Sequence, residues 1–435
     1  MEIRFLLYRF VNLVVAPTHS LRRIKETKKS QSHGSTKSSI PQLDSKDKRA
    51  ILSVGFFSSL TLVIVFILTQ TGVSFGRELS GEEPHSFVKL AYGLDVLMHL
   101  TAFVLVTTDI SLILFMSANS LRGYVLKRKN KRENLFTRDE KSLLWKTVIV
   151  KSVLSVLVGI ILTAVSFHNA TLTPEVNERH YRFKNFPSSL DGFRLVQVSD
   201  IHGGPTIGRS NVESVVEQVN TLDADAITLT GDIIDGRLST FRAALQPLHD
   251  LHATRGVYLC TGNHEYVVSS DEVDKWMDEF KQYGIRPLRN ERVAIFSKHN
   301  LTWSNREGFA LYPPTASLSE DDQRLLDQMS LNSSFVEWPT QRTVPVHDEP
   351  SDLEGFYLAG IEDYMTKGDV AGVDADPERA FGSRLDNRTL IALAHQPSHI
   401  FDVAEFNPEL VLSGHTHGGQ IFPNHLNVRL SNPYL

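Results

Sequence analysis

Five short apolar runs in the second half of the chain each end in residues that can bind a metal ion. The runs have the length and β-branched content of strands, and they span 193–198, 226–230, 256–261, 389–394 and 409–413. The motifs that they lead into are Asp200-Ile201-His202, Gly231-Asp232, Gly262-Asn263-His264-Glu265, Ala394-His395-Gln396 and Gly414-His415-Thr416-His417. In open α/β sheets, binding residues collect beyond the carboxyl ends of the strands. The pattern therefore predicts an α/β domain in which these side chains converge on one crevice.

The segment between the first two runs has the pattern of an amphipathic helix. Ser210 and Glu213 have the spacing of a capping box, which marks the start of a helix. Apolar residues then repeat at helical spacing, at Val212, Val215, Val216 and Val219. A strand, a loop with candidate ligands, a helix and a second strand form a βαβ unit, which again indicates the α/β class.

The order of the five motifs and the residues in them resemble those of the calcineurin-like metallophosphoesterase family. That family has the motifs D-x-H, G-D, G-N-H-[DE], H and G-H-x-H, and all five are present here without substitution, over roughly residues 185 to 424. The resemblance implies a two-sheet sandwich flanked by helices, which hydrolyses a phosphate ester. Relatives normally continue for several strands beyond the last motif, whereas this chain ends at Leu435. We therefore expect a domain over 185–435 whose sheet is incomplete at its carboxyl-terminal end.

The resemblance also implies a site for two divalent metal ions. Carried over motif by motif, it assigns one ion to Asp200, His202, Asp232 and His417 and the other to Asp232, Asn263, His395 and His415. Asp232 would bridge the two ions, and His264 would be the catalytic residue that stabilises the transition state or protonates the leaving alkoxide. Carboxylate, amide and imidazole ligands without a thiolate suit Mn, Fe or Zn. Two such ions about 3.5 to 4 Å apart can activate a water for in-line attack on phosphorus.

Three other acidic residues near the motifs are weaker candidates. Asp235 is the last residue of the segment GDIID and could hydrogen-bond to a metal ligand. Glu265 could orient a ligand in the same way. Asp363 follows an apolar run, 355–361, that could add a strand to the same crevice. A lone Asp at a strand end is usually a helix cap or a turn residue, so we expect neither aspartate to be a metal ligand.

The first half of the chain carries long apolar runs. Residues 50–70 contain no charge, 148–167 contain a single lysine, and 90–118 are interrupted by three ionisable residues. Runs of this length predict about three transmembrane helices within 50–168. The preceding residues 1–49 form a basic segment, which we expect to be partly disordered because its second half is rich in Ser, Lys and Gln.

Charge predicts an orientation in the membrane. Before residue 50 there are 11 Lys and Arg against 4 acidic residues, between 120 and 146 there are 9 against 3, and in 71–89 there are 2 against 3. Positive loops remain cytoplasmic, so three spans would place the catalytic domain in the lumen or outside the cell, whereas a hairpin at 90–118 would reverse this. Glycosylation sequons agree with an extracytoplasmic domain, and they lie at Asn169, Asn300, Asn332 and Asn387.

The catalytic half of the chain is acidic. From residue 170 to the end there are 22 Lys and Arg against 38 Asp and Glu, a net charge of −16. No broad basic surface invites a nucleic-acid backbone, so we expect no nucleic-acid partner. The one cysteine, Cys260, cannot form an internal disulfide and is expected to be a buried apolar residue.

A polar insertion, 297–353, separates two apolar runs of the domain. We expect a solvated loop that is helical around 321–329 and that could also cover the site and select substrates.

Two classes of function stay open on the sequence. The first is a membrane-anchored phosphoesterase, for which anchoring next to the bilayer makes a lipid phosphate one candidate substrate. The second is a non-catalytic membrane scaffold or receptor that keeps the metal site for structure. The sequence does not distinguish monoesters, diesters and pyrophosphates as substrates, and it does not indicate the oligomeric state.

Overall fold

The computed structural model describes residues 67, 69–71, 73, 81–128, 138–299, 301–306, 308–311, 319–328, 336–338, 341–344, 353–363, 374–382, 384, 388–419, 428–430 and 432. The predicted basic segment 1–49 and nearly all of the predicted span at 50–70 lie outside these residues.

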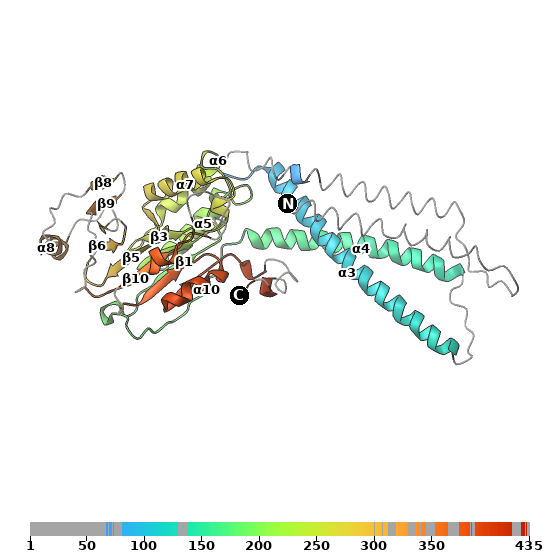
Figure 1. Ribbon diagram of the computed structural model, residues 1–435. Coiled ribbons are helices and arrows are strands. Elements are labelled where there is room, and N and C mark those ends of the chain that lie inside the picture. Colours follow the sequence, from blue (N-terminus) through green and yellow to red (C-terminus); the bar gives the residue numbers. More distant parts are fainter. Residues whose placement is uncertain are drawn as a thin grey trace. The chain divides into compact units, whose positions relative to one another are not determined.

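Two long helices come before the α/β domain in the chain, α3 (Ser86–Arg128) and α4 (Arg138–Ala170) (Figure 1). Each contains an apolar stretch long enough to cross a membrane, Ser86–Thr108 in α3 and Val150–Ala170 in α4. Only 11% of each stretch is buried within the protein, so these helices do not form the core of a soluble domain. The runs at 90–118 and 148–167 are therefore apolar helices of spanning length, as predicted.

The first sheet of the domain is parallel, with the strand order β1-β2-β3-β4. Its strands are β1 (Leu195–Val198), β2 (Ala226–Thr230), β3 (Val257–Cys260) and β4 (Ile285–Pro287). The helices that alternate with them are α5 (Arg209–Asn220), α6 (Leu238–Leu245) and α7 (Ser270–Gln282). The first three predicted runs are thus the first three strands of this sheet.

The second sheet is mixed, with the strand order β12-β11-β10-β5-β6-β7-β9-β8. It consists of β5 (Glu291–Phe296), β6 (Leu301–Ser304), β7 (Gly308–Leu311), β8 (Val336–Trp338), β9 (Gln341–Val344), β10 (Gly355–Gly360), β11 (Leu390–Leu393) and β12 (Leu410–Leu412). Strands β10, β11 and β12 are parallel, and the remaining neighbours are antiparallel. Its helices are α8 (Glu320–Gln328), α9 (Pro377–Phe381) and α10 (Ile400–Val403). The two remaining metal-motif runs are β11 and β12, and the run at 355–361 is β10.

The described residues of the polar insertion include four strands. Strands β6 to β9 lie within 297–353 and extend the second sheet beyond β5, so the prediction of a loop was wrong for these residues. Leu301 and Trp303 of β6 belong to the same buried cluster as Phe296, and Thr302 and Ser304 are buried as well, so both faces of this strand are covered. The polar residues of the insertion led to the prediction of a loop there. The helix predicted around 321–329 is confirmed as α8.

Three buried apolar clusters show how the layers pack. Alternate residues of β3 face opposite ways, because Val257 and Leu259 pack under α5, α6 and α7 whereas Tyr258 and Cys260 pack against the second sheet. The third cluster lies on the outer face of the second sheet, beside α8, α9 and α10. The domain is therefore a two-sheet sandwich flanked by helices, as predicted, and Cys260 is buried in it.

The helix predicted after the first motif is α5, which spans Arg209–Asn220. Its inward face consists of buried valines, Val212, Val216 and Val219. The predicted capping box is absent, because the helix begins earlier, with Gly208 as its N-cap and Ser210 already inside the first turn. Glu213 instead pairs with Arg209, at 2.8 Å between Oε1 and Nε.

Helix α7 gives a direct test of the packing. Phe280 is fully buried in the cluster under the first sheet, whereas its neighbour Lys281 is partly exposed. We expect Phe280→Ala to lower the free energy of unfolding by about 3 to 5 kcal/mol, since it leaves a cavity. Lys281→Ala should change it by less than about 0.5 kcal/mol. Denaturant unfolding of both variants measures the difference, and equal effects would contradict the packing described.

Candidate functional site

The predicted site residues lie on loops that follow parallel strands. Asp200 and His202 follow β1, Asp232 follows β2, His395 follows β11 and His415 follows β12. Because parallel strands end at the same edge, each sheet presents its loops on one side. The convergence predicted from the sequence requires in addition that the two sheets bring these edges together.

Side-chain hydrogen bonds join the two edges. Gln197 of β1 donates from Nε2 to the carbonyl oxygen of Ser413, just after β12, at 2.9 Å. The backbone N–H of His415 donates to the carboxylate of Asp200, at 2.9 and 3.1 Å. His395 Nδ1 lies 2.7 Å from the carbonyl oxygen of Thr230, to which it donates. Loops of both sheets are thereby fixed around one centre.

Three overlapping groups of side chains at this centre could each hold a metal ion, with all ligand atoms of a group within 4.8 Å of one another. The groups are Asp200, His202 and His417; His202, Asp232 and His264; and Asp232, His395 and His415. Six of the seven predicted ligands are therefore brought together. The first and third groups contain residues that the resemblance assigns to different ions, and Asp232, the predicted bridge, lies in two groups.

The Asp232 carboxylate lies at the middle of the site and is 2% exposed. Its Oδ2 atom faces three imidazoles, at 3.1 Å from His395 Nε2, 3.8 Å from His202 Nε2 and 4.0 Å from His264 Nε2. The same Nε2 atom of His202 lies 3.1 Å from Nε2 of His417. Two imidazole nitrogens at that distance need a proton or a cation between them.

Asn263, the seventh predicted ligand, supplies a separate test of whether the site fits a metal. Its Oδ1 atom is buried and has no hydrogen-bond partner among the described residues. An unpartnered buried acceptor costs about 1 to 3 kcal/mol, which a bound cation would offset. His395 agrees, because Nδ1 is engaged with Thr230 and only Nε2 is directed at the centre.

The backbone is strained at these positions. Eight described non-glycine residues have positive φ, and five of them are predicted ligands: Asp200 (57°), His202 (52°), Asp232 (53°), His415 (69°) and His417 (46°). Left-handed backbone at non-glycine residues costs roughly 1 to 3 kcal/mol and persists where the surrounding structure enforces it. Five of the eight such residues thus lie in the loops that carry the predicted ligands.

Glu265 ties two of the motifs together. Its buried carboxylate accepts hydrogen bonds from the backbone N–H groups of Gly262, Ile233, Asp232 and Ile234, at 2.6, 2.7, 3.0 and 3.3 Å. Burial raises the pKa of Glu265 to about 6, although these donors oppose the shift. The glutamate holds the backbone of Asp232 in place, in agreement with the expectation that it orients a ligand.

Asp235 hydrogen-bonds to the Nδ1 atoms of two histidines, on the side of each ring away from the centre. One carboxylate oxygen accepts from Nδ1 of His202, at 3.2 Å, and from Nδ1 of His264. Burial opposes ionisation of Asp235, but the two hydrogen bonds dominate and hold its pKa well below the usual range. Burial likewise opposes charge on both imidazoles, and Asp235 nevertheless raises the pKa of each. The Nε2 atoms of both rings are left to face the centre.

Asp363 is not part of the three groups. It is buried and accepts from Nε2 of Gln396, the residue after His395, at 2.7 Å. The adjacent Glu362, which the sequence analysis missed, accepts from Thr261 at 2.7 Å and from Tyr266. These carboxylates brace the loops after β3 and β11. The signal in the sequence was an acidic pair directly after an apolar run.

Comparisons with known proteins agree with the motifs. The sequence profile of the calcineurin-like phosphoesterase family matches residues 193–419. The chain is 30% identical over 292 residues to the bovine transmembrane protein with metallophosphoesterase domain, covering 66% of this chain and 54% of that protein. The Danio rerio protein of the same name is 30% identical over 287 residues, which cover 65% of this chain and 54% of that protein. The UDP-2,3-diacylglucosamine pyrophosphatase LpxG of Chlamydia trachomatis is 26% identical over 260 residues, which cover 57% of this chain and 72% of that protein.

The chain spans about half the length of the first two of these relatives. No solved structure matches it. The family profile covers more than half of the chain and includes all five motifs, in the order in which the fold brings them to one centre. The chain belongs to the calcineurin-like phosphoesterase family, a family of metal-dependent enzymes.

Proposed function

We propose that this protein is a membrane-anchored phosphoesterase that uses two divalent metal ions to hydrolyse a phosphate ester. The observation that carries the proposal is the pair of ligand groups on either side of Asp232, with His264 beside them. A structural metal site has a closed set of protein ligands, and it does not require a proton donor beside them. Here a histidine fixed by Asp235 stands next to the ligands, which favours catalysis.

The side chains present fit the proposed ions. Asp200, His202 and His417 would hold one ion, Asn263, His395 and His415 the other, and Asp232 both. Oxygen and imidazole ligands without a thiolate suit Mn, Fe or Zn. When bound, the pair supplies an activated water and neutralises charge on the phosphate.

His264 is the proposed catalytic residue. Its Nδ1 atom contacts Asp235, so Nε2 is directed at the centre, 4.0 Å from Asp232 Oδ2. Although burial opposes it, Asp235 raises the pKa of His264, which favours the imidazolium form, and in that form Nε2 can donate a proton to the leaving oxygen or hydrogen-bond to the transition state. Asp235 acts through His264 and His202 by fixing the orientation of both rings.

We infer a phosphate group attached to a lipid as the substrate class. Apolar helices of spanning length come before the domain in the chain, and as membrane anchors they would keep the site near a bilayer. LpxG, one of the similar proteins, is named for the hydrolysis of a diacylated glucosamine nucleotide. Both observations favour a lipid over a soluble ester.

Hydrolysis of aryl phosphates tests the proposed activity. The full chain in detergent, supplied with Mn²⁺ or Zn²⁺, should hydrolyse p-nitrophenyl phosphate or bis(p-nitrophenyl) phosphate. We expect His264→Gln to keep its metal but to lower kcat by about 10² to 10⁴, because it removes the proton donor. Asp232→Asn should lose both turnover and metal, since it removes the shared negative charge. Nitrophenol release and the metal content of each variant are the measurements.

Lys281→Gln, a substitution at a partly exposed position of α7, serves as the control and should match the wild type in both measurements. Wild-type protein with a full complement of metal that hydrolyses neither ester would overturn the proposal in favour of a scaffold or receptor. Unchanged turnover in both site variants would exclude the mechanism.

Metal affinity should rise with pH. In the metal-free protein burial opposes charge on His395, yet Asp232 raises the pKa of His395 to about 9. A metal ion held by His395 Nε2 must displace this proton below that pKa. We therefore expect the affinity for Mn²⁺ to increase by at least roughly tenfold per pH unit between about pH 6 and about pH 8. Calorimetric titration at several pH values measures the slope.

The matched variant for this measurement is His395→Gln, which should bind metal more weakly and with a slope reduced by about one proton. An affinity for Mn²⁺ that does not change with pH in the wild type would contradict the assignment of His395 as a ligand.

We propose further that the chain crosses the membrane more than once and that its catalytic domain is extracytoplasmic or lumenal. The segment 120–146 lies between the two apolar stretches, Ser86–Thr108 and Val150–Ala170, and has 9 Lys and Arg against 3 acidic residues. A segment of that charge is retained in the cytoplasm, so the apolar stretch of α4 would carry the chain to the opposite side. Asn169 lies at the end of α4, and the other three sequons lie outside the described residues.

Protease protection in sealed microsomes tests this orientation. A catalytic domain in the lumen should survive added protease and be digested only after the membrane is dissolved with detergent. Removal of N-glycans should also increase its mobility on a gel, and replacement of the four sequon asparagines by Gln should abolish that shift. Digestion of the domain in intact microsomes would place it in the cytoplasm instead.

A further inference from the structure

Residues 81–85, just before α3, form a segment that packs against the start of α5. The backbone N–H of Arg209 donates to the carbonyl oxygen of Glu82, at 2.7 Å. The backbone N–H of Ser210 donates to Oε1 of Glu83, at 2.6 Å, across 127 positions of the chain. The segment that leads into the first long apolar helix therefore bonds directly to a helix of the α/β domain.

The fit between this segment and the domain is close. A Cβ atom at Gly208 would lie 2.5 Å from Cδ of Pro84 and 3.0 Å from the carbonyl oxygen of Glu82. Gly208 has a φ of −100°, which other residues adopt, so the close approach and not the backbone conformation favours glycine here. The space that remains in this contact, which is lined in part by Pro205 and Phe241, is only about 10 Å³.

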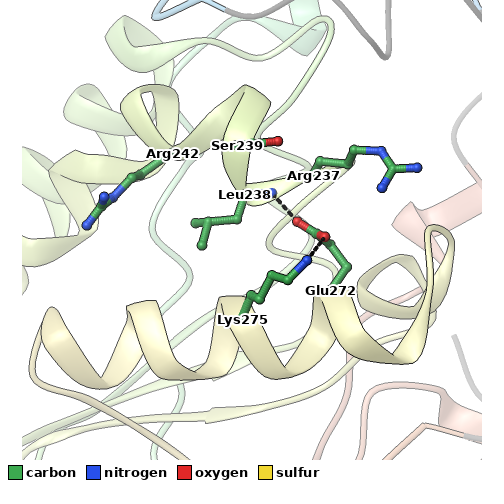
Figure 2. Close-up of a pocket in the computed structure, with 6 residues that line it drawn as sticks. All are labelled: Arg237, Leu238, Ser239, Arg242, Glu272 and Lys275. Atoms are coloured by element: carbon green, nitrogen blue, oxygen red, sulfur yellow. Dashed lines mark hydrogen bonds and ion pairs between the residues drawn. The ribbon is translucent and has the colours of Figure 1, made fainter.

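The Glu83 carboxylate caps a helix that has no cap of its own. The N-cap of α5, Gly208, offers no side chain, and the first N–H groups of a helix have no partner within it. A carboxylate also suits the positive end of the helix dipole. Helix α6, which follows the second metal motif, is capped in the same way, because Glu272 of α7 accepts from the N–H of Leu238 at 2.6 Å (Figure 2). The cap of α6 comes from within the domain, whereas the cap of α5 comes from the segment before α3.

The loop 203–208 connects this cap to the candidate site. It follows the first metal motif and ends where α5 begins. At its start, the carbonyl oxygen of Gly203 accepts from the backbone N–H of Asp235, at 2.9 Å, and the carboxylate of Asp235 holds His202. At its end, the loop is held by the contacts of Glu83 with α5. One side of the site is thus fixed at both ends of a single loop.

The chain just after α4 reaches the same end of α5. Nδ2 of Asn211, in the first turn of α5, donates to the carbonyl oxygen of Thr171, at 3.3 Å. The apolar stretches Ser86–Thr108 and Val150–Ala170 therefore lie in the chain between two segments that contact one helix end. Two membrane crossings, one by each stretch, would return the chain to the side of the bilayer on which residues 81–85 lie. The contacts agree with the proposed orientation.

We propose that Glu83 is a positioning residue of the candidate metal site. By capping α5 it fixes the loop 203–208, and through that loop it holds His202 in the place where it would bind an ion. The inference rests on the proposed function, because His202 is a ligand of one of the proposed ions. The site is then complete only with a residue that lies outside the catalytic domain and next to the first apolar helix, so a displacement of α3 would loosen the site.

Amide hydrogen exchange of the metal-free full chain in detergent tests the cap without any need for metal or turnover. Glu83 is exposed, so its replacement leaves the core intact. We expect Glu83→Ala to accelerate exchange within 201–212 about tenfold, because a helix cap is lost, and to leave exchange within α7 unchanged. Glu83→Gln keeps an acceptor oxygen and should restore most of the protection. Glu82→Ala is the matched control and should behave like the wild type, since the contact uses only the backbone oxygen of Glu82.

Unchanged exchange within 201–212 in Glu83→Ala would overturn the proposal. Equal acceleration in α7 would do so as well, because it would show a general loss of stability. Gly208→Ala tests the same contact from the other side and should also accelerate exchange. Combined with Glu83→Ala, it should add less than the product of the two single effects, because both variants disrupt one contact. Independent effects would contradict the close approach at Gly208.

Calorimetric titration with Mn²⁺ then tests the positioning role. Glu83→Ala should weaken the affinity about threefold to tenfold, and Glu83→Gln should restore it. Wild-type affinity in Glu83→Ala, with exchange accelerated, would show that the cap does not position a ligand and would overturn the role. A wild type that binds no Mn²⁺ would overturn the proposed function and the positioning role with it, whereas the exchange result would still decide whether Glu83 caps α5 and orders the loop.

Discussion

Burial of the Asp232 carboxylate is the interaction on which the rest of the site depends. A carboxylate that is 2% exposed is costly unless positive charge or donors surround it. His395 Nε2 lies 3.1 Å from one of its oxygens, and the backbone N–H of His264 donates to the other at 2.8 Å. Glu265 in turn holds the backbone N–H of Asp232. The site is therefore built outward from one buried charge, through groups that are themselves held by further hydrogen bonds.

The sandwich explains why such a centre can be assembled from distant parts of the chain. Parallel strands in both sheets deliver their loops at carboxyl edges, and Gln197 joins the end of β1 to the end of β12. The apolar cluster between the sheets fixes the separation of the two edges. A substitution in that cluster would move the loops of one sheet relative to those of the other, so the geometry of the candidate site depends on packing away from it.

The sequence predicted the parts of the fold that depend on local pattern. Strands β1, β2, β3, β11 and β12 are short apolar runs that end in polar residues, and periodic valines predicted α5. The extra strands of the second sheet were missed, because the polar residues around them resemble a loop and because the strands form by pairing outward from β5, which no local pattern shows. The roles of Glu265 and Asp235 depend on contacts between loops about thirty residues apart in the chain, and no spacing rule for a single sequence encodes such contacts.

The strain and the unpartnered oxygen at this centre have a common consequence. The left-handed backbone of five predicted ligands and the buried Oδ1 of Asn263 each cost free energy in the metal-free protein. A ligand that binds only the folded chain stabilises it in proportion to the logarithm of its concentration over Kd. Metal binding would therefore offset strain that the fold otherwise carries alone. The stability of the domain would then rise with the occupancy of its site, because the same side chains serve both.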